Sequence, residues 1–79
     1  MSGEHEKYMA MAIEEARKGL NAGERPFGSV IIRDGEVVGR AYAVVHSSGD
    51  PTSHAETNAV RDASANLNSE ILENCTLYT

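Results

Sequence analysis

FGSVIIRDGEVVGRAYAVV, residues Phe27 to Val45, contains the strongest secondary-structure signal in the chain. Its first part, FGSVII, is a short apolar run rich in branched residues, which favours a buried strand. Asp34-Gly35 follows, and this dipeptide is typical of a type I′ turn between antiparallel strands. The second part, EVVGRAYAVV, should return antiparallel to the first, so the sequence predicts a β-hairpin.

Helical patterns flank the hairpin on both sides. Before it, apolar residues at offsets of three and four predict an amphipathic helix that stops at Gly23, ahead of Pro26. These residues are Met9, Ala12, Ile13, Ala16 and Leu20. After the hairpin, apolar residues at steps of four predict a second helix that begins near His54. They are Ala55, Ala59, Ala63 and Leu67.

The remaining segments carry weaker signals. Residues 47–53 are composed of Ser, Gly, Asp, Pro and Thr, which predicts a loop. CTLYT, Cys75 to Thr79, is a strand-like run. Cys75 is interpreted as a small buried hydrophobe, and His5 and His46 as exposed residues without a functional role.

The order helix, strand, strand, helix, strand predicts an α/β domain in which helices pack on a sheet. Three short strands form an incomplete sheet with two exposed edges. No repeat, low-complexity tract or linker divides the chain, so residues 1–79 are expected to form a single partial domain.

Composition limits the functions that the chain can have. No apolar run approaches the roughly 20 residues that span a bilayer, which argues against a membrane location. The N-terminus lacks a secretory signal and the chain has a single cysteine, so the cytoplasm is the expected compartment. A net charge of −5 and scattered Lys and Arg residues make nucleic acid an unfavourable partner. Small or neutral ligands are expected instead.

The segment DPTSHAE, Asp50 to Glu56, has two interpretations. In the first, Asp50 or Thr52 caps the second helix and Glu56 is an acidic residue of its first turn. In the second, His54 and Glu56 are half of a metal-dependent active site. Residues two apart on a regular helix point to different sides, so these side chains can converge only at a helix terminus.

Three segments in register, PFGSVIIRDGEVVGRA, DPTSHAETNAVRDA and CTLYT, resemble the cytidine and deoxycytidylate deaminase superfamily. The residues of these segments are most similar to the guanine deaminase branch, with tRNA adenosine deaminases and fungal cytosine deaminases close behind. The resemblance runs from about residue 8 to residue 79. It implies the N-terminal part of a three-layer α/β/α cytidine-deaminase-like fold. It also implies a zinc-dependent hydrolytic deaminase of a purine or pyrimidine base.

The resemblance also implies roles for the His-Ala-Glu motif. In this family the motif supplies one zinc ligand, here His54, and the catalytic glutamate, here Glu56, which moves protons during hydrolysis. Zinc lowers the pKa of bound water to about 7. Two thiolate ligands come from a Pro-Cys-x-x-Cys segment, which in the family follows the TLYT strand and here falls beyond Thr79. The 79-residue chain alone is therefore expected to be inactive.

For the substrate pocket the resemblance is less specific. Phe27 matches an aromatic residue beside the base, although a core aromatic is an equally good interpretation. Ala43 stands where the family usually has an asparagine that helps to hold the base, and alanine has no polar side-chain atom to replace it. A catalytically silent dimerisation or binding module is therefore an alternative, and a generic fragment with a helix cap is a third. The expected partners are a nucleobase or nucleoside and a second copy of the chain.

Overall fold

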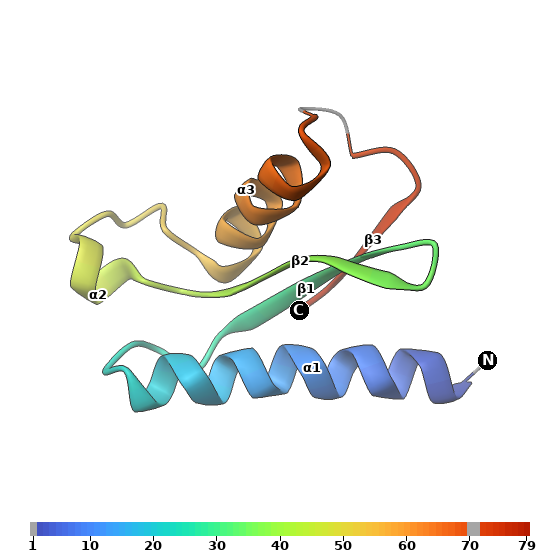
Figure 1. The fold of residues 1–79 in the computed structure, drawn as a ribbon. Helices are drawn as coiled ribbons and strands as arrows, with labels where there is room; N and C mark the ends of the chain where they lie inside the picture. The colour runs from blue at the N-terminus through green and yellow to red at the C-terminus, as the bar shows by residue number, and fades with distance from the viewer. Residues whose placement is uncertain (1, 70–71) are drawn as a thin grey trace.

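Helices and strands alternate along the chain in a computed structural model that describes residues 2–69 and 72–79. Met1, Glu70 and Ile71 lie outside the described residues. The elements are α1 (Ser2–Asn21), β1 (Gly28–Arg33), β2 (Glu36–Tyr42), α2 (Val45–Ser48), α3 (Ala55–Leu67) and β3 (Cys75–Tyr78) (Figure 1). Among the described residues, no helix has the length and apolar character needed to cross a membrane.

The structure confirms the predicted hairpin. β1 and β2 pair antiparallel, and Arg33 lies opposite Glu36 across the turn. Asp34 and Gly35 have φ angles of 51° and 78°. A type I′ turn requires this left-handed conformation at both central positions, which explains why Asp-Gly forms it.

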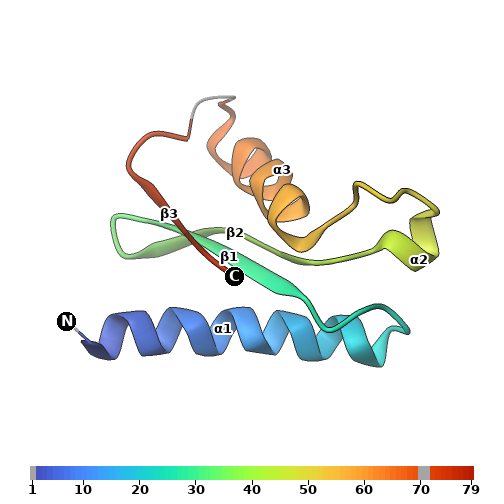
Figure 2. The ribbon, with the colours of Figure 1, turned by 180° about the vertical axis from the view of Figure 1, so that it is seen from behind.

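The sheet separates two helical layers. β3 pairs antiparallel with β1, so the strand order is β2-β1-β3 and β2 and β3 are the edges of the described sheet. α1 covers one face and α3 covers the other, as both views show (Figures 1 and 2). The predicted three-layer α/β/α arrangement and open sheet are therefore confirmed.

α3 packs against the sheet through small residues. Ala55, Ala59 and Ala63 are buried, as their spacing predicts. Ala59 and Ala63 pack on Ile31 of β1. They also lie over Gly39 of β2, where an added Cβ atom would come within 2.8 Å of the Ala63 Cβ atom. The small side chains on both elements therefore set how closely α3 approaches the sheet.

α1 is confirmed as a helix, but part of its apolar stripe is exposed. Tyr8 and Ala12 form a buried cluster with Val30 and Ile32 of β1. The face of α1 that packs on the sheet therefore includes only the Ala12 side of the predicted apolar stripe. Three residues of the stripe are exposed: Met9 is 36% exposed, Ile13 is 55% exposed and Leu20 is 57% exposed.

Two predicted boundaries in the segment between the hairpin and α3 are wrong. The returning strand ends at Tyr42 and does not reach Val45, and Val45–Ser48 form α2 at the start of the predicted loop. Gly49, with a φ of 68°, closes this short helix. A helix of four residues is too short to show the apolar periodicity by which helices are recognised.

Candidate active site

A pocket of about 460 Å³ lies at the N-terminal end of α3. This volume is within the range of about 300–1,000 Å³ that is usual for small-ligand sites. Its walls come from the segment before β1, from the segment between β2 and α3, and from the first turn of α3. The lining residues are Arg25, Phe27, Ala43, Val45, Pro51, His54, Ala55 and Glu56. The structure thus brings all four residues predicted for the site to one pocket.

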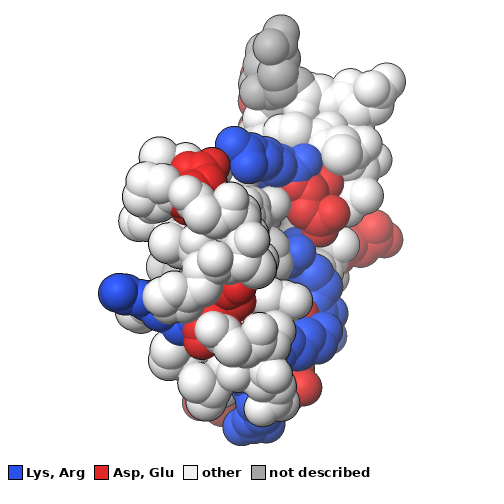
Figure 3. Space-filling view, turned by 90° about the vertical axis from the view of Figure 1, so that its left-hand side faces the viewer, with Lys and Arg blue, Asp and Glu red and all other residues white. Residues whose placement is uncertain are grey.

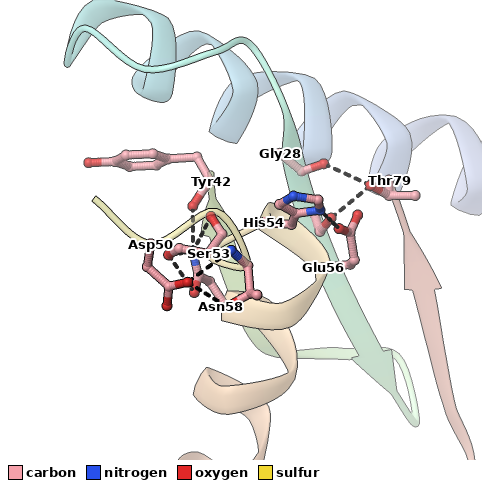
Figure 4. A network of polar contacts seen from close by, with 10 residues as sticks. Gly28, Tyr42, Asp50, Ser53, His54, Glu56, Asn58 and Thr79 are labelled. Atoms are coloured by element: carbon pink, nitrogen blue, oxygen red, sulfur yellow. Dashed lines mark hydrogen bonds and ion pairs between the residues drawn. The ribbon is translucent and has the colours of Figure 1, made fainter. Parts of the chain in front are cut away.

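His54 and Glu56 converge at the start of α3 (Figure 4). His54 is the N-cap residue, with extended φ and ψ angles of −81° and 160°, and Glu56 lies in the first helical turn. Because His54 is not yet helical, its side chain can turn towards a residue two positions later. Its Nδ1 atom lies 3.3 Å from Glu56 Oε1, and the two side chains are 60% and 44% exposed.

The capping interpretation of this segment is wrong for both predicted caps. Among the described residues, no side-chain hydrogen bond caps α3 at its N-cap position, His54. Asp50 accepts hydrogen bonds from the Thr52 backbone N–H at 2.9 Å and the Thr52 hydroxyl at 2.6 Å, which forms a turn ahead of the helix. These bonds, the one from the hydroxyl above all, lower the pKa of Asp50. The other part of that interpretation is confirmed, since Glu56 is an acidic residue of the first turn of α3.

Asn58 holds the loop that leads into α3. Its Nδ2 atom donates to the Tyr42 carbonyl at 3.1 Å and to the Ser53 hydroxyl at 3.2 Å. Ser53 is buried, and its carbonyl accepts a hydrogen bond from Val44 at 3.0 Å. This network fixes where His54 enters the helix. Sequence reasoning missed Asn58, because its backbone acceptor at Tyr42 lies 16 residues upstream.

Glu24 is a second residue that sequence reasoning missed. It is 6% exposed, and its carboxylate accepts hydrogen bonds from the backbone N–H groups of His46 and Ser47 at 2.9 Å each. Hydrogen bonding from Ser47, above all, outweighs burial and lowers the pKa of Glu24. An isolated acidic residue in a turn carries no sequence signal that predicts this arrangement.

Phe27 and Ala43 form adjacent parts of the pocket wall. Phe27 is 59% exposed, so the core-aromatic interpretation is wrong. Its carbonyl accepts a hydrogen bond from the Ala43 N–H at 3.1 Å, which joins the two walls. Ala43 is 4% exposed and presents only a methyl group. The pocket therefore has no side-chain amide at this position.

The described residues supply one ligand of a zinc site, the imidazole of His54. A catalytic zinc ion takes three protein ligands and an open position, and an imidazole is a usual ligand. His54 supplies an accessible imidazole beside an accessible carboxylate. Within residues 2–69 and 72–79, no group of three or more His, Cys, Asp or Glu side chains is placed to hold a metal. Cys75 is half-buried in β3, where its Sγ atom lies 3.5 Å from the Glu73 carbonyl oxygen.

A three-layer domain with His-Ala-Glu at a helix start beside a pocket belongs to the cytidine-deaminase-like class. Residues 2–79 match the model of the cytidine and deoxycytidylate deaminase zinc-binding region. The chain belongs to this family.

Two kinds of relative are similar to most of the chain. It is 42% identical over 76 residues to the guanine deaminase of Bacillus subtilis (strain 168), covering 95% of this chain and 49% of the relative. It is 38% identical over 73 residues to the tRNA-specific adenosine deaminase of Aquifex aeolicus (strain VF5), covering 92% and 48%. The X-ray structure of the Bacillus subtilis guanine deaminase matches with a TM-score of 0.89 and 41% identity, covering 94% of this chain and 48% of that chain. The chain spans about half the length of these relatives.

Proposed function

We propose that the full-length protein is a zinc-dependent hydrolytic deaminase of a purine or pyrimidine base, similar to guanine deaminases. The observation that carries this proposal is the convergence of His54 and Glu56 in one pocket. Both side chains are partly exposed, so an imidazole and a carboxylate are accessible to a metal and a substrate. The 42% identity to a guanine deaminase supports the choice of reaction.

The chain's own residues would divide the chemistry between them. His54 would hold zinc through its imidazole, and the metal, when bound, supplies a water activated for attack near neutral pH. Glu56 would accept a proton from the attacking water and deliver it to the ring nitrogen. It would then carry a second proton, from the hydroxyl added to the ring carbon, to the leaving amine as the C–N bond breaks and the carbonyl forms. Phe27 would contact the flat face of the base at the pocket mouth.

The remaining zinc ligands would come from outside the described residues. We expect two thiolates from a Pro-Cys-x-x-Cys segment that follows Thr79 in the full-length protein. With His54 as its one family ligand, the 79-residue chain should bind zinc weakly and release no ammonia from guanine. Zinc titration and an ammonia assay on this chain test the expectation. Tight zinc binding together with turnover would contradict it.

A free base is favoured over RNA as the substrate. The chain has a net charge of −5, whereas phosphate contacts usually come from a basic surface. The face seen in Figure 3 carries basic and acidic side chains side by side. The similarity to a tRNA-specific adenosine deaminase makes RNA the second candidate, at 38% identity. Assays of guanine, cytosine, cytidine, adenosine and tRNA would separate the two.

A catalytically silent binding module is the alternative that Ala43 supports. A pocket that presents a methyl group where an amide is usual loses a hydrogen bond to the base, and with it affinity and discrimination. A silent module would bind zinc and bases without turnover. Deaminase activity of the full-length protein above that of a zinc-free sample would exclude this alternative.

Two substitutions in the full-length protein test the proposed roles. Glu56→Gln should keep its zinc and lose about 10²–10⁴-fold in kcat, because the amide cannot carry a proton. His54→Ala should lose both zinc and turnover, because it removes a ligand. Glu14→Ala, an exposed acidic residue on α1, is the matched control. Near-normal turnover of Glu56→Gln would show that the proton-transfer role is wrong.

A further inference from the structure

Glu24 is a buried carboxylate that the proposed chemistry does not use. Acidic side chains are seldom fully buried unless they are paired. Its partners are two backbone amides: Oε1 accepts from the His46 N–H and Oε2 accepts from the Ser47 N–H, both at 2.9 Å. A buried carboxylate whose two oxygens both bind backbone amides fixes the position of that backbone.

The two amides belong to the first turn of α2. The first N–H groups of a helix lack partners within the helix, and a Ser, Thr, Asp or Asn at the N-cap usually supplies one. Here the N-cap is Val44, which makes no side-chain capping hydrogen bond. Glu24 supplies both bonds from 22 residues upstream of His46. The position of α2 therefore depends on Glu24.

The backbone of Glu24 is itself fixed to the end of α1. Its N–H donates to the Gly19 carbonyl at 2.9 Å, and the Gly23 N–H donates to the Leu20 carbonyl at 3.1 Å. Gly23 has a φ of 84°, the left-handed geometry that closes many helices. Glu24 therefore connects the end of α1 to the start of α2.

These attachments lie directly beside two walls of the pocket. Arg25 and Phe27 line one wall just after Glu24, and Val45 lines the other wall just before His46. The Ala43–Phe27 backbone hydrogen bond fixes the walls at that level, whereas Arg25 and Val45 lie next to the Glu24 attachment. We propose that Glu24 is a positioning residue that sets the separation of Arg25 from Val45 and so the fit of the base. This inference rests on the pocket being the substrate site proposed above.

Hydrogen–deuterium exchange tests the attachment without a substrate. In the full-length Glu24→Ala protein, the amides of His46 and Ser47 should exchange about tenfold faster or more, while α3 exchanges as in the wild type. Glu14→Ala should leave exchange at both amides unchanged. Exchange at wild-type rates in Glu24→Ala would overturn the proposal.

Binding and turnover test whether the attachment serves the site. For guanine and adenosine, Glu24→Ala should raise the Kd and the KM about tenfold, with kcat within about twofold and zinc content unchanged. Glu24→Asp should recover part of the loss, because its carboxylate can still accept hydrogen bonds. A loss of folded protein with unchanged KM would show a purely structural role and overturn the proposal.

The same measurements separate this inference from the proposed function. A wild-type protein that binds the bases but deaminates none of them would refute the proposed reaction, and the ratio of Kd values would still decide the role of Glu24. A wild-type protein that turns over a base, with a Glu24→Ala variant of equal Kd and KM, would refute the positioning role alone. A wild-type protein that binds neither base would refute both.

Discussion

α3 and α1 cover opposite faces of one sheet, but they contact β2 in different ways. α3 meets β2 through alanines that lie over Gly39, so little space separates helix from strand. α1 also approaches β1 closely, since an added Cβ atom at Gly28 would lie 2.3 Å from the Ala12 carbonyl oxygen. It reaches β2 and the hairpin turn, in contrast, through long side chains. The Tyr8 hydroxyl donates to the Gly35 carbonyl at 3.3 Å, and Glu15 pairs with Arg40 of β2 at 2.8 Å.

The difference matches what each helix carries. His54 and Glu56 lie at the start of α3, so a shift of this helix moves the site directly. A contact between small residues permits few alternative packings, because no flexible side chain can adjust to a displacement. The contacts of α1 with β2 and the turn involve long side chains that can adjust, and its close contact at Gly28 carries no site residue. We therefore expect substitutions under α3 to affect the site most strongly.

Gly39→Val should produce the largest effect on the site, because it enlarges the contact under α3, the helix that carries His54 and Glu56. The added Cβ atom would lie 2.5 Å from the Ala59 carbonyl oxygen, so the helix must move. We expect a loss of about 3 kcal/mol in the free energy of unfolding and reduced turnover per folded molecule. Urea denaturation and deaminase assays of the full-length protein measure both.

Gly3→Ala is the matched control for Gly39→Val. It adds a methyl group in α1 at a position where a Cβ atom meets nothing within 4 Å. Alanine is the better helix former, so stability should be unchanged or rise by up to about 1 kcal/mol. A Gly39→Val variant that behaved like this control would refute the idea that close packing positions α3.

The same contrast explains how much of the fold could be predicted from sequence. The stripe of Ala55, Ala59 and Ala63 identified the buried face of α3 correctly, and Val60, the larger apolar residue beside it, is 42% exposed. On α1 the apolar stripe is broader than its contact with the described sheet. Which edge of such a stripe is buried depends on tertiary packing, which periodicity does not contain. Ile13 therefore belongs to the apolar stripe and is nevertheless 55% exposed.

The candidate site shows a similar division. The motif DPTSHAE predicted where His54 and Glu56 lie, because short-range geometry at a helix start brings them together. Glu24 and Asn58 could not be assigned in the same way. Each acts through hydrogen bonds to backbone distant in sequence, 22 residues for Glu24 with His46 and 16 for Asn58 with Tyr42. A backbone acceptor or donor leaves no trace in residue identity.

Acid should weaken the attachment of α1 to β2. Burial raises the pKa of Glu15, but the hydrogen bonds from Lys18 and Arg40 lower it by more. The net pKa of Glu15 is therefore below the ordinary value of 4.5. A carboxyl with a depressed pKa in the folded state stabilises the fold above its unfolded pKa, and this contribution is lost as the pH falls through the folded pKa. The urea midpoint should therefore fall as the pH drops below about 4.5.

Glu15→Gln measures the share of that pH dependence that belongs to Glu15. The amide does not titrate, so the variant should be less stable at pH 7 and should lose less stability on acidification. Part of the slope should remain, because the pKa values of Glu24 and Asp50 are also lowered. A Glu15→Gln protein whose midpoint falls as steeply as that of the wild type would contradict the assignment.

The smallest effect is expected one residue earlier on α1. Glu14 and Arg17 form an ion pair at 3.4 Å, but their side chains are 52% and 66% exposed, so water and salt screen the attraction. Glu15, its neighbour, is 5% exposed in its pair with Arg40. Glu14→Ala should therefore change the free energy of unfolding by less than about 0.5 kcal/mol. A loss in urea denaturation as large as that of Glu15→Gln would show that burial does not distinguish the two pairs.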